Sequence, residues 1–409
     1  MSKVVIIGGG PAGMIAAITA ANKHEGIEVL LLEKNEKLGK KLFITGKGRC
    51  NITNVTDVPT LLANIVSNPK FLYSAFYSFD AYSSIDFFES NGLKTKIERG
   101  NRLFPVSDKS SDVIRVFEDA LKKAKVKIKL NTEVISVSKN DNVFTINTKN
   151  GTYEADYVII ATGGVSYTQT GSTGDGYKIA KAFKHGLVQP EPGLIGLVTV
   201  ENDSEALQGL ALKNVTVKLE INDNVIYEEL GEMLFTHFGL SGPIIISASS
   251  YFKGHSGLIS VDLKPGLSEE KLDKRILSDF EKYANRDLIN ALDDLLPKNL
   301  IPYIIERTSI DPRIKIHQIN KIQRQLLVQT IKALTFHIKR KYDMNQAIIT
   351  QGGIPVKEIN PNTMASKLVD GLYFVGEVID VDGLTGGFNL QIAYSTGYLA
   401  GISIPTQEA

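Results

Sequence analysis

An early break in the first apolar stretch most restricts how this chain can fold. A Gly-Gly-Gly-Pro run occupies residues 8–11, with apolar sequence on both sides. An export signal or a membrane anchor requires an uninterrupted apolar helix, which glycine and proline disfavour. The β-branched residues 4–7 predict a buried strand, and residues 14–21, rich in Ala and Ile, predict a short helix. We therefore expect a strand, a glycine turn and a helix rather than a signal peptide.

A second apolar strand, predicted at residues 27–32, completes a β-α-β unit and ends in Glu33. The turn reads Gly8-x-Gly10-x-x-Gly13, which is the dinucleotide-binding fingerprint in its required context. The first glycine permits the tight turn, the second lets a pyrophosphate approach the backbone, and the third lets the helix lie close to the sheet. The amino end of the helix would hold the diphosphate. Glu33 can accept both ribose hydroxyls and would repel a 2′-phosphate, so the unit favours FAD or NAD over NADP.

Composition narrows the class of protein. The 409 residues carry a net charge of +1 and are 43% hydrophobic and 22% charged, as in ordinary globular proteins of two or three domains. This charge gives no global attraction to nucleic acid or to an anionic membrane. Cys50, the single cysteine, excludes an intrachain disulfide and the paired-cysteine chemistry of disulfide-reductase flavoenzymes. We expect a cytoplasmic protein with no membrane span and no metal site; the oligomeric state stays open.

The pattern of elements predicts an α/β fold with an insertion. Residues 158–161 are apolar and end at Thr162-Gly163-Gly164, as in a central parallel strand that meets a ligand. The nucleotide-binding domain is predicted to be discontinuous, and residues 60–92 are predicted to be helical with their aromatic residues mostly in the core. The expected domains are 1–190 with 347–409 for the nucleotide, and 191–346 for the insertion, which is β-rich over 191–265 and 331–346 and helical over 266–330.

One segment of the insertion is strongly basic. Residues 313–341 contain eight Lys or Arg and no Asp or Glu. A solvated helical face is the usual explanation for such a run. The alternative is a docking surface for an anionic substrate, for the phosphate of NADPH or for RNA.

The C-terminal segment decides between NAD and FAD. A strand at 372–375 leads to Gly376-Glu377, then to Asp380 and Asp382, and then to residues 386–389, Gly-Gly-Phe-Asn, which open a helix. The amino end of such a helix would stabilise the negative charge that develops on a flavin's pyrimidine edge. An acid beside the ribityl chain could accept its hydroxyl protons. The pattern therefore favours FAD.

Several long motifs resemble one family. TGKGRCNITN, ATGGVSYTQTGSTGDGY, GEMLFTHFGLSGP, TQGGIPVKEINPNTMASK and GLYFVGEVIDVDGLTGGFNLQIA closely resemble the bacterial BaiN-like, or aminoacetone-oxidase-like, flavoproteins, which are NAD(P)/FAD-dependent oxidoreductases. The similarity runs from residue 4 to about residue 400. It implies a Rossmann-like FAD-binding domain of the glutathione-reductase superfamily, interrupted by a β-rich and a helical subdomain. Lys47 departs from the family pattern, in which glycine is frequent at this position.

The resemblance also implies a set of residues that touch FAD: Gly8, Gly10, Ala12, Gly13, Glu33, Lys34, Arg49, Val134, Thr162, Gly163, Gly376, Glu377, Gly386, Gly387, Phe388 and Asn389. Our reading of the residues adds Pro11 at the helix start, Lys41 and Asn51 in the basic glycine-rich connection, Ala161 at a strand end, and Asp380.

The reaction stays open between three classes. The leading hypothesis is an FAD-dependent oxidoreductase acting on a small molecule, with the flavin reduced by NAD(P)H or directly by substrate, as in amine oxidation with oxygen as acceptor. The alternatives are a flavin-dependent nucleic-acid-modifying enzyme and a flavin-binding redox sensor. No second strand–GxGxxG–helix pattern is present for NAD(P)H. The catalytic candidates are His237, Cys50 and Tyr167, together with Thr236, although His237 and Cys50 also fit structural roles.

Overall fold

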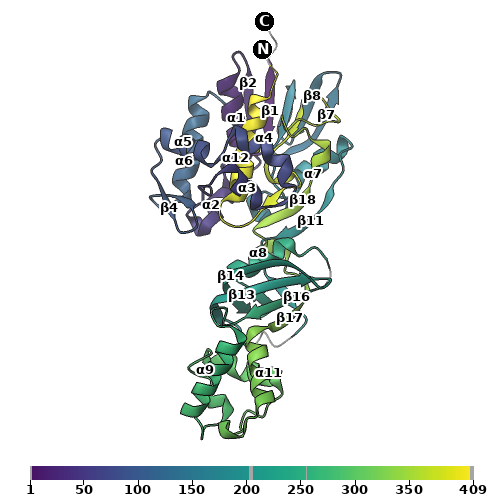
Figure 1. The fold of residues 1–409 in the computed structure, drawn as a ribbon. Helices are drawn as coiled ribbons and strands as arrows, with labels where there is room; N and C mark the ends of the chain where they lie inside the picture. Colours follow the sequence, from purple (N-terminus) through teal and green to yellow (C-terminus); the bar gives the residue numbers. More distant parts are fainter. Residues whose placement is uncertain (1, 202–205, 255, 406–409) are drawn as a thin grey trace. The chain divides into compact units, whose positions relative to one another are not determined.

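A computed structural model describes residues 2–201, 206–254 and 256–405 (Figure 1). The chain divides into two compact units. Unit 1 comprises Met1–Gly193 and Asp343–Ala409, and unit 2 comprises Leu194–Tyr342.

Unit 1 is built on a five-stranded parallel sheet in the order β19-β10-β1-β2-β6. Its strands are β1 (Lys3–Ile7), β2 (Glu28–Leu32), β6 (Lys127–Lys129), β10 (Tyr157–Ile160) and β19 (Leu372–Phe374). In the central register, Val5 lies between Leu30 and Val158. The inner strands are almost continuously apolar because helices cover both faces of such a sheet. The expected α/β, Rossmann-like fold is confirmed, and β19 brings the end of the chain back to the first sheet.

The first and last helices of unit 1 pack closely together (Figure 1). They are α1 (Pro11–Lys23) and α12 (Phe388–Ile402). A Cβ on Gly397 would lie 2.3 Å from the carbonyl oxygen of Ala12, so only glycine permits this approach. A buried aromatic cluster lies beside α12: the Phe88 ring is 5.3 Å from that of Phe117, and the Phe117 ring is 6.1 Å from that of Tyr394.

The segment 60–92 was predicted to be helical, and the structure shows that it is helical only in part. The first helix ends at Ala63, and after a short strand Asn68, with a left-handed φ of +56°, precedes the turn that begins at Pro69. Asp80 then caps a new helix by accepting from the backbone N–H of Ser83. The pieces are α3 (Val58–Ala63), β3 (Ile65–Ser67), η2 (Pro69–Leu72), α4 (Tyr73–Ser78) and α5 (Ala81–Ser90).

The remaining elements of unit 1 are short. They are α2 (Lys40–Ile44), η1 (Thr45–Gly48), β4 (Thr95–Glu98), β5 (Arg102–Pro105), α6 (Ser110–Lys123), β7 (Val134–Asn140), β8 (Val143–Thr148), β9 (Gly151–Ala155), η3 (Thr168–Thr170), α7 (Asp175–Ala182), β11 (Val188–Gly193), η8 (Met344–Gln346), β18 (Ile349–Gly353), η9 (Val356–Glu358), η10 (Gly376–Val378) and β20 (Asp382–Gly383).

Unit 2 has a core of its own, formed by a closed barrel and a group of helices. The barrel order is β12-β15-β14-β13-β16-β17. The strands are β12 (Leu197–Thr199), β13 (Ala211–Ile221), β14 (Asn224–Thr236), β15 (Gly239–Ser241), β16 (Gly257–Asp262) and β17 (Leu334–Lys341). The helical elements are α8 (Pro243–Tyr251), α9 (Glu269–Lys282), η5 (Leu288–Asn290), η6 (Lys298–Leu300), α10 (Ile301–Thr308), η7 (Ile316–Gln318) and α11 (Lys321–Lys332).

Among the residues that the structure describes, no helix is both long enough and apolar enough to cross a membrane. Within the same residues, no cluster of His, Cys, Asp and Glu has the arrangement of a metal site.

Candidate functional site: two glycine turns in unit 1

The first glycine turn is closed by protein on two sides and open on a third. Gly8 has φ of +113°, and a Cβ there would lie 2.4 Å from the carbonyl oxygen of Ala161. A Cβ on Gly13 would lie 2.0 Å from the carbonyl oxygen of Gly8. A Cβ on Gly10, in contrast, would meet no atom within 4 Å, and α1 begins after Gly10 without a side-chain cap. The free N–H groups of this helix end therefore face open space, as an anion site requires.

Glu33 is buried beside this turn at the end of β2. One of its carboxylate oxygens accepts from the backbone N–H of Gly9 at 2.7 Å, and the other accepts from the backbone and side chain of Asn35 at 2.8 and 2.6 Å. A carboxylate has about four acceptor sites, so capacity for a hydroxyl group remains after these three bonds. The position and the chemistry both suit the ribose role expected for Glu33.

The second glycine turn precedes α12. Gly386 and Gly387 have φ of +121° and +105°, and a Cβ on Gly387 would lie 2.4 Å from the carbonyl carbon of Thr53. The side-chain amide of Asn54 donates to the carbonyl oxygen of Gly386 at 3.2 Å. No side chain caps α12, so its amino end also offers unpaired N–H groups.

The two turns are held together inside unit 1. A Cβ on Gly376, at the end of β19, would lie 2.9 Å from the Cβ of Ala12 in α1. Gln391 of α12 is fully buried and accepts from the hydroxyls of Thr53 and Ser84 at 2.6 and 2.9 Å. Its amide group donates to the carbonyl oxygen of Phe79 at 2.9 Å. This saturated network fixes the start of α12 against the segment that follows Cys50.

Glu377 and Lys41, both expected to touch the cofactor, pair with each other. The Lys41 Nζ lies 2.7 Å from Glu377 Oε2 and donates to the Ser166 hydroxyl at 2.6 Å. Glu377 also accepts from the backbone N–H groups of Thr350 at 2.9 Å and Gly164 at 3.3 Å. The carboxylate therefore joins β18, the turn after β10 and the end of β19.

Other expected cofactor residues fall into three groups. Lys34 and Arg49 bind acids: Lys34 pairs with Asp175 at 2.6 Å, and Arg49 pairs with Glu98 and Asp108. Asn389 fixes its own loop by accepting from the backbone N–H of Gly383 at 2.9 Å. The rest lie at or near strand and helix ends: Pro11, Ala12, Val134, Ala161, Thr162, Gly163, Asp380 and Phe388.

Two buried polar atoms near these turns lack a partner in the part of the chain that the structure describes. They are Asn51 Oδ1 and Thr162 Oγ1. Buried polar groups are nearly always hydrogen-bonded, so each has capacity for a ligand atom. Both residues belong to the expected cofactor set.

The catalytic candidates differ in accessibility. Cys50 is fully buried, and burial raises the pKa of its thiol to about 12, so it is neither accessible nor a thiolate at neutral pH. Tyr167 is half-buried with φ of +52° at the start of η3. Thr236 and His237 lie at the β14–β15 hairpin of unit 2, where His237 is exposed and its ring lies 5.2 Å from that of Phe238.

Our sequence reasoning missed several residues that build the site. Thr350 is buried and its hydroxyl accepts from the backbone N–H groups of Val165 and Ser166 at 2.8 and 3.1 Å. Hydrogen bonds that hold segments of the site together are also made by the buried residues Ser166, Thr53 and Gln391. A polar residue inside an apolar helix, as in the sequence Asn-Leu-Gln-Ile-Ala around Gln391, is the one signal that could have indicated such a role.

These features fit an FAD molecule. The open space at Gly10 beside an uncapped helix suits a pyrophosphate, and Glu33 suits a ribose. The uncapped amino end of α12 suits the edge of a flavin that becomes anionic on reduction. Asn51 and Thr162 supply unused hydrogen-bonding capacity.

Residues 2–403 match the family model described as the HI0933-like protein Rossmann domain. The chain belongs to this family. The family consists of FAD-dependent oxidoreductases, so the resemblance to these flavoproteins, the assignment as an enzyme and the assignment of FAD are confirmed.

Curated relatives are similar over nearly their whole length. The chain is 32% identical to the 3-dehydro-bile acid delta(4,6)-reductase of Clostridium scindens, covering 98% of both chains. It is 32% identical to the ribosomal RNA dihydrouridine synthase of Escherichia coli, covering 96% of both, and 31% identical to that of Haemophilus influenzae, covering 99% of both.

A solved structure shows the same fold at low identity. The 3-ketosteroid-delta4-(5alpha)-dehydrogenase of Rhodococcus jostii, solved with 4-androstene-3,17-dione, aligns with a TM-score of 0.51 and 14% identity over 98% of this chain and 96% of that one. At this identity the similarity describes the fold alone.

Proposed function

We propose that this protein reduces a carbon–carbon double bond conjugated to a carbonyl group. The observation that carries the proposal is the full-length similarity to relatives named for two such reductions. A 3-keto group is conjugated with the 4,6 double bonds of a steroid, and the double bond that becomes saturated in dihydrouridine is conjugated with a ring carbonyl. At the double bond directly attached to the carbonyl, a hydride adds to the carbon distant from the carbonyl, and a proton adds to the carbon next to it.

FAD, when bound, supplies the hydride to this substrate and accepts one from the reductant. The residues of the chain would position the FAD and stabilise its charge. Gly10 and the start of α1 bind the diphosphate, Glu33 accepts from the ribose, and the start of α12 stabilises negative charge on the ring. The proton comes from a side chain or from solvent. Of the three catalytic candidates, Tyr167 and His237 have the accessibility for this role, and the buried Cys50 does not.

NAD(P)H is the proposed reductant. It would bind without a second Rossmann turn, because the sequence has only one strand–GxGxxG–helix pattern of the required kind. Two substrate classes are compatible with the reaction: a small conjugated ketone, which is the leading one on sequence grounds, and uridine within RNA.

Two half-reactions test this proposal. The FAD-loaded protein is mixed anaerobically with NADH or NADPH, and loss of the flavin's visible absorbance is followed. A conjugated ketone such as a Δ4-3-ketosteroid, or uridine-containing RNA, is then added. We expect the colour to return with formation of the saturated product. A reduced enzyme that is reoxidised by oxygen but by none of these acceptors would contradict the proposal.

A further inference from the structure

Basic residues gather around the β4–β5 hairpin of unit 1. Segments 34–51 and 94–109 together contain eleven Lys or Arg and three Asp or Glu, whereas the whole chain has a net charge of +1. These two segments therefore carry a local excess of positive charge that the rest of the chain offsets.

Backbone hydrogen bonds bring the two segments together. Ile52 and Leu103 are joined by a 2.8 Å bond from the N–H of Ile52, and the N–H of Leu103 donates to Thr53 at 3.0 Å. The Arg49 guanidinium lies 4.2 Å from the centre of the Phe104 ring, and that of Arg102 lies 5.9 Å from it. Arg49 of the first segment and Arg102 of the second thus lie at the same strand, β5, whose hairpin with β4 can be followed in Figure 1.

The acids of this region are already neutralised. Asp108 accepts from Lys96 at 2.7 Å and from Arg49 Nε at 2.8 Å, and these bonds lower the pKa of its carboxyl. A hydrogen bond from Arg49 likewise lowers the pKa of Glu98. Glu36, the third acid, pairs with Lys40 at 3.3 Å.

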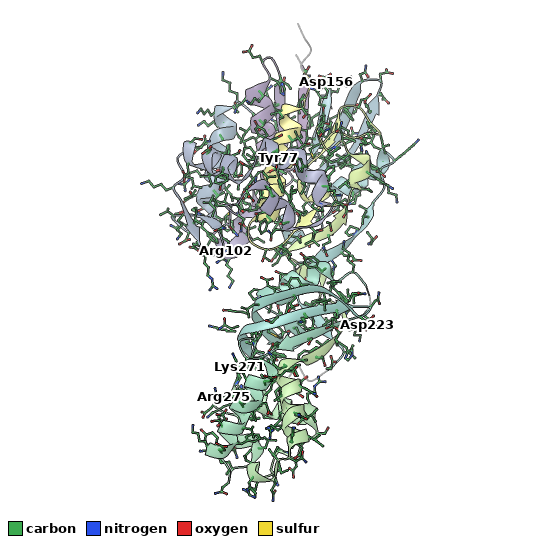
Figure 2. All side chains as sticks on the ribbon, in the orientation of Figure 1. Tyr77, Arg102, Asp156, Asp223, Lys271 and Arg275 are labelled. Atoms are coloured by element: carbon green, nitrogen blue, oxygen red, sulfur yellow. The ribbon has the colours of Figure 1, made fainter. Side chains whose placement is uncertain are left out.

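Six exposed cations remain, and none has an acidic partner among the residues that the structure describes. We call them the basic face: Lys37, Lys47, Lys94, Arg99, Arg102 and Lys109. Figure 2 shows Arg102 at the edge of unit 1 with its side chain directed outward.

The basic run of unit 2 differs from this face. Its Lys315, Arg324 and Lys332 pair with Asp287, Asp273 and Asp262 at 2.8, 2.6 and 2.5 Å. Residues 194–342 contain 19 acidic and 19 basic residues. Three of the eight cations of the run at 313–341 are therefore paired with acids from other segments, and unit 2 as a whole has no excess of positive charge.

The basic face is connected to the second glycine turn. Asn54 forms a backbone bridge with Arg102, and its side chain donates to the carbonyl oxygen of Gly386. A molecule bound along the hairpin thus lies close to the turn expected to hold the flavin ring.

We propose that the basic face binds the sugar-phosphate backbone of an RNA substrate and presents a base to the flavin. This rests on the proposed function in its uridine form. Lys94 and Arg99 flank the strand β4 and are five residues apart, a separation of up to about 16 Å at 3.3 Å per residue. One carboxylate on a small molecule cannot neutralise cations so far apart, whereas successive phosphates can.

The test compares two triple variants of the FAD-loaded protein. The first removes three charges of the basic face: Lys94→Gln, Arg99→Gln and Arg102→Gln. The matched control removes three exposed charges of unit 2: Arg313→Gln, Lys321→Gln and Lys339→Gln. Binding of a short, fluorescein-labelled, uridine-containing single-stranded RNA is measured by anisotropy over a range of salt concentrations, with FAD content and thermal unfolding recorded for each protein.

We expect the first variant to bind at least tenfold more weakly and to lower the slope of log K against log salt by about 2, since each phosphate contact contributes about 0.7 for a single strand. The control should bind like the wild type. Equal weakening of both variants, or no RNA binding by the wild type, overturns the proposal.

Reduction of a small conjugated ketone separates this proposal from the proposed reaction. If the wild type reduces the ketone but does not bind RNA, the RNA-binding proposal is refuted and the proposed reaction stands. If RNA binding depends on the basic face but the wild type reduces neither substrate, the proposed reaction is refuted and the RNA-binding proposal stands.

Discussion

Substitution of Gly10 by Ala should separate cofactor binding from folding. The backbone there has φ of −79° and ψ of 179°, which alanine adopts freely, and the added Cβ would meet no protein atom within 4 Å. Loss of glycine at a helix N-cap costs about 1 kcal/mol, which is offset by about 0.4–1 kcal/mol from the restricted unfolded chain. The free energy of unfolding of the apoprotein should therefore change by less than about 1 kcal/mol.

The same Cβ would stand where the pyrophosphate approaches the start of α1. Displacing the phosphate weakens hydrogen bonds to a charged group, each contributing about 1.5–3 kcal/mol. Loss of two such bonds predicts at least a hundredfold weaker binding of FAD, since about 1.4 kcal/mol corresponds to a factor of ten. The measurements are titration of the apoprotein with FAD and denaturant unfolding without it.

Two other glycines provide the controls. Gly266→Ala also adds a Cβ to open space, but far from this turn in sequence and in unit 2, so FAD binding should not change. Gly13→Ala places a Cβ 2.0 Å from the Gly8 oxygen and should lower the free energy of unfolding by about 1–3 kcal/mol or more. If Gly10→Ala binds FAD with wild-type affinity, the turn does not hold the diphosphate.

Three further predictions concern single interactions. Glu377→Gln leaves Lys41 without its carboxylate and should lower the free energy of unfolding, measured by thermal unfolding, by about 1–3 kcal/mol, because the pair is only about a quarter exposed. The double variant with Lys41→Met should regain part of this loss, and additive losses would contradict the pairing. Because burial raises the pKa of Cys50, the native state keeps the thiol proton while the unfolded chain releases it, so the free energy of unfolding should fall as pH rises from 9.0 towards about 12. Cys50→Ala should reduce that fall in denaturant titrations, and an unchanged pH profile would refute this contribution of Cys50. Gln391→Leu leaves the buried Thr53 hydroxyl without its acceptor, while the Ser84 hydroxyl keeps the carbonyl oxygen of Asp80, so the free energy of unfolding should fall by about 1–3 kcal/mol. An unchanged free energy of unfolding in denaturant titrations would show that the network relaxes.

The local part of the fold could be predicted because its determinants are adjacent in sequence. The strand at 4–7, the turn and the helix each follow from residues within one short window, and so does the role of Gly8 in a left-handed turn. The domains were predicted to change at 190/191 and 346/347, and the structure divides the chain at 193/194 and 342/343. Composition shifts mark such changes because an inserted unit has its own hydrophobic core.

The long-range part of the candidate site could not be predicted in the same way. Lys41 and Glu377 are 336 positions apart; Lys41 was assigned to the cofactor from its charge and Glu377 from the family resemblance, and neither assignment indicated that they pair. Arg49 was assigned to the cofactor as well, but its guanidinium is shared by Glu98 and Asp108, which belong to the hairpin and its flank. The partner of a charged side chain depends on tertiary contacts, and a single sequence does not reveal them.

The arrangement of basic residues shows most clearly that a single sequence does not reveal tertiary contacts. It also connects the proposed reaction with the proposed RNA binding. The run at 313–341 has eight cations and no acid in sequence, yet aspartates from elsewhere in unit 2 pair with three of these cations. The basic face of unit 1 combines segments that are separated by more than forty residues in sequence. A base within RNA must leave its stack to reach a flavin, at a cost of a few kcal/mol, and binding of the flanking phosphates can offset that cost. A small conjugated ketone does not need to be unstacked, and it carries no phosphates. Of the two candidate substrates, only RNA would therefore make use of the cations of the basic face, of which Arg102 is bridged to Asn54 beside the second glycine turn.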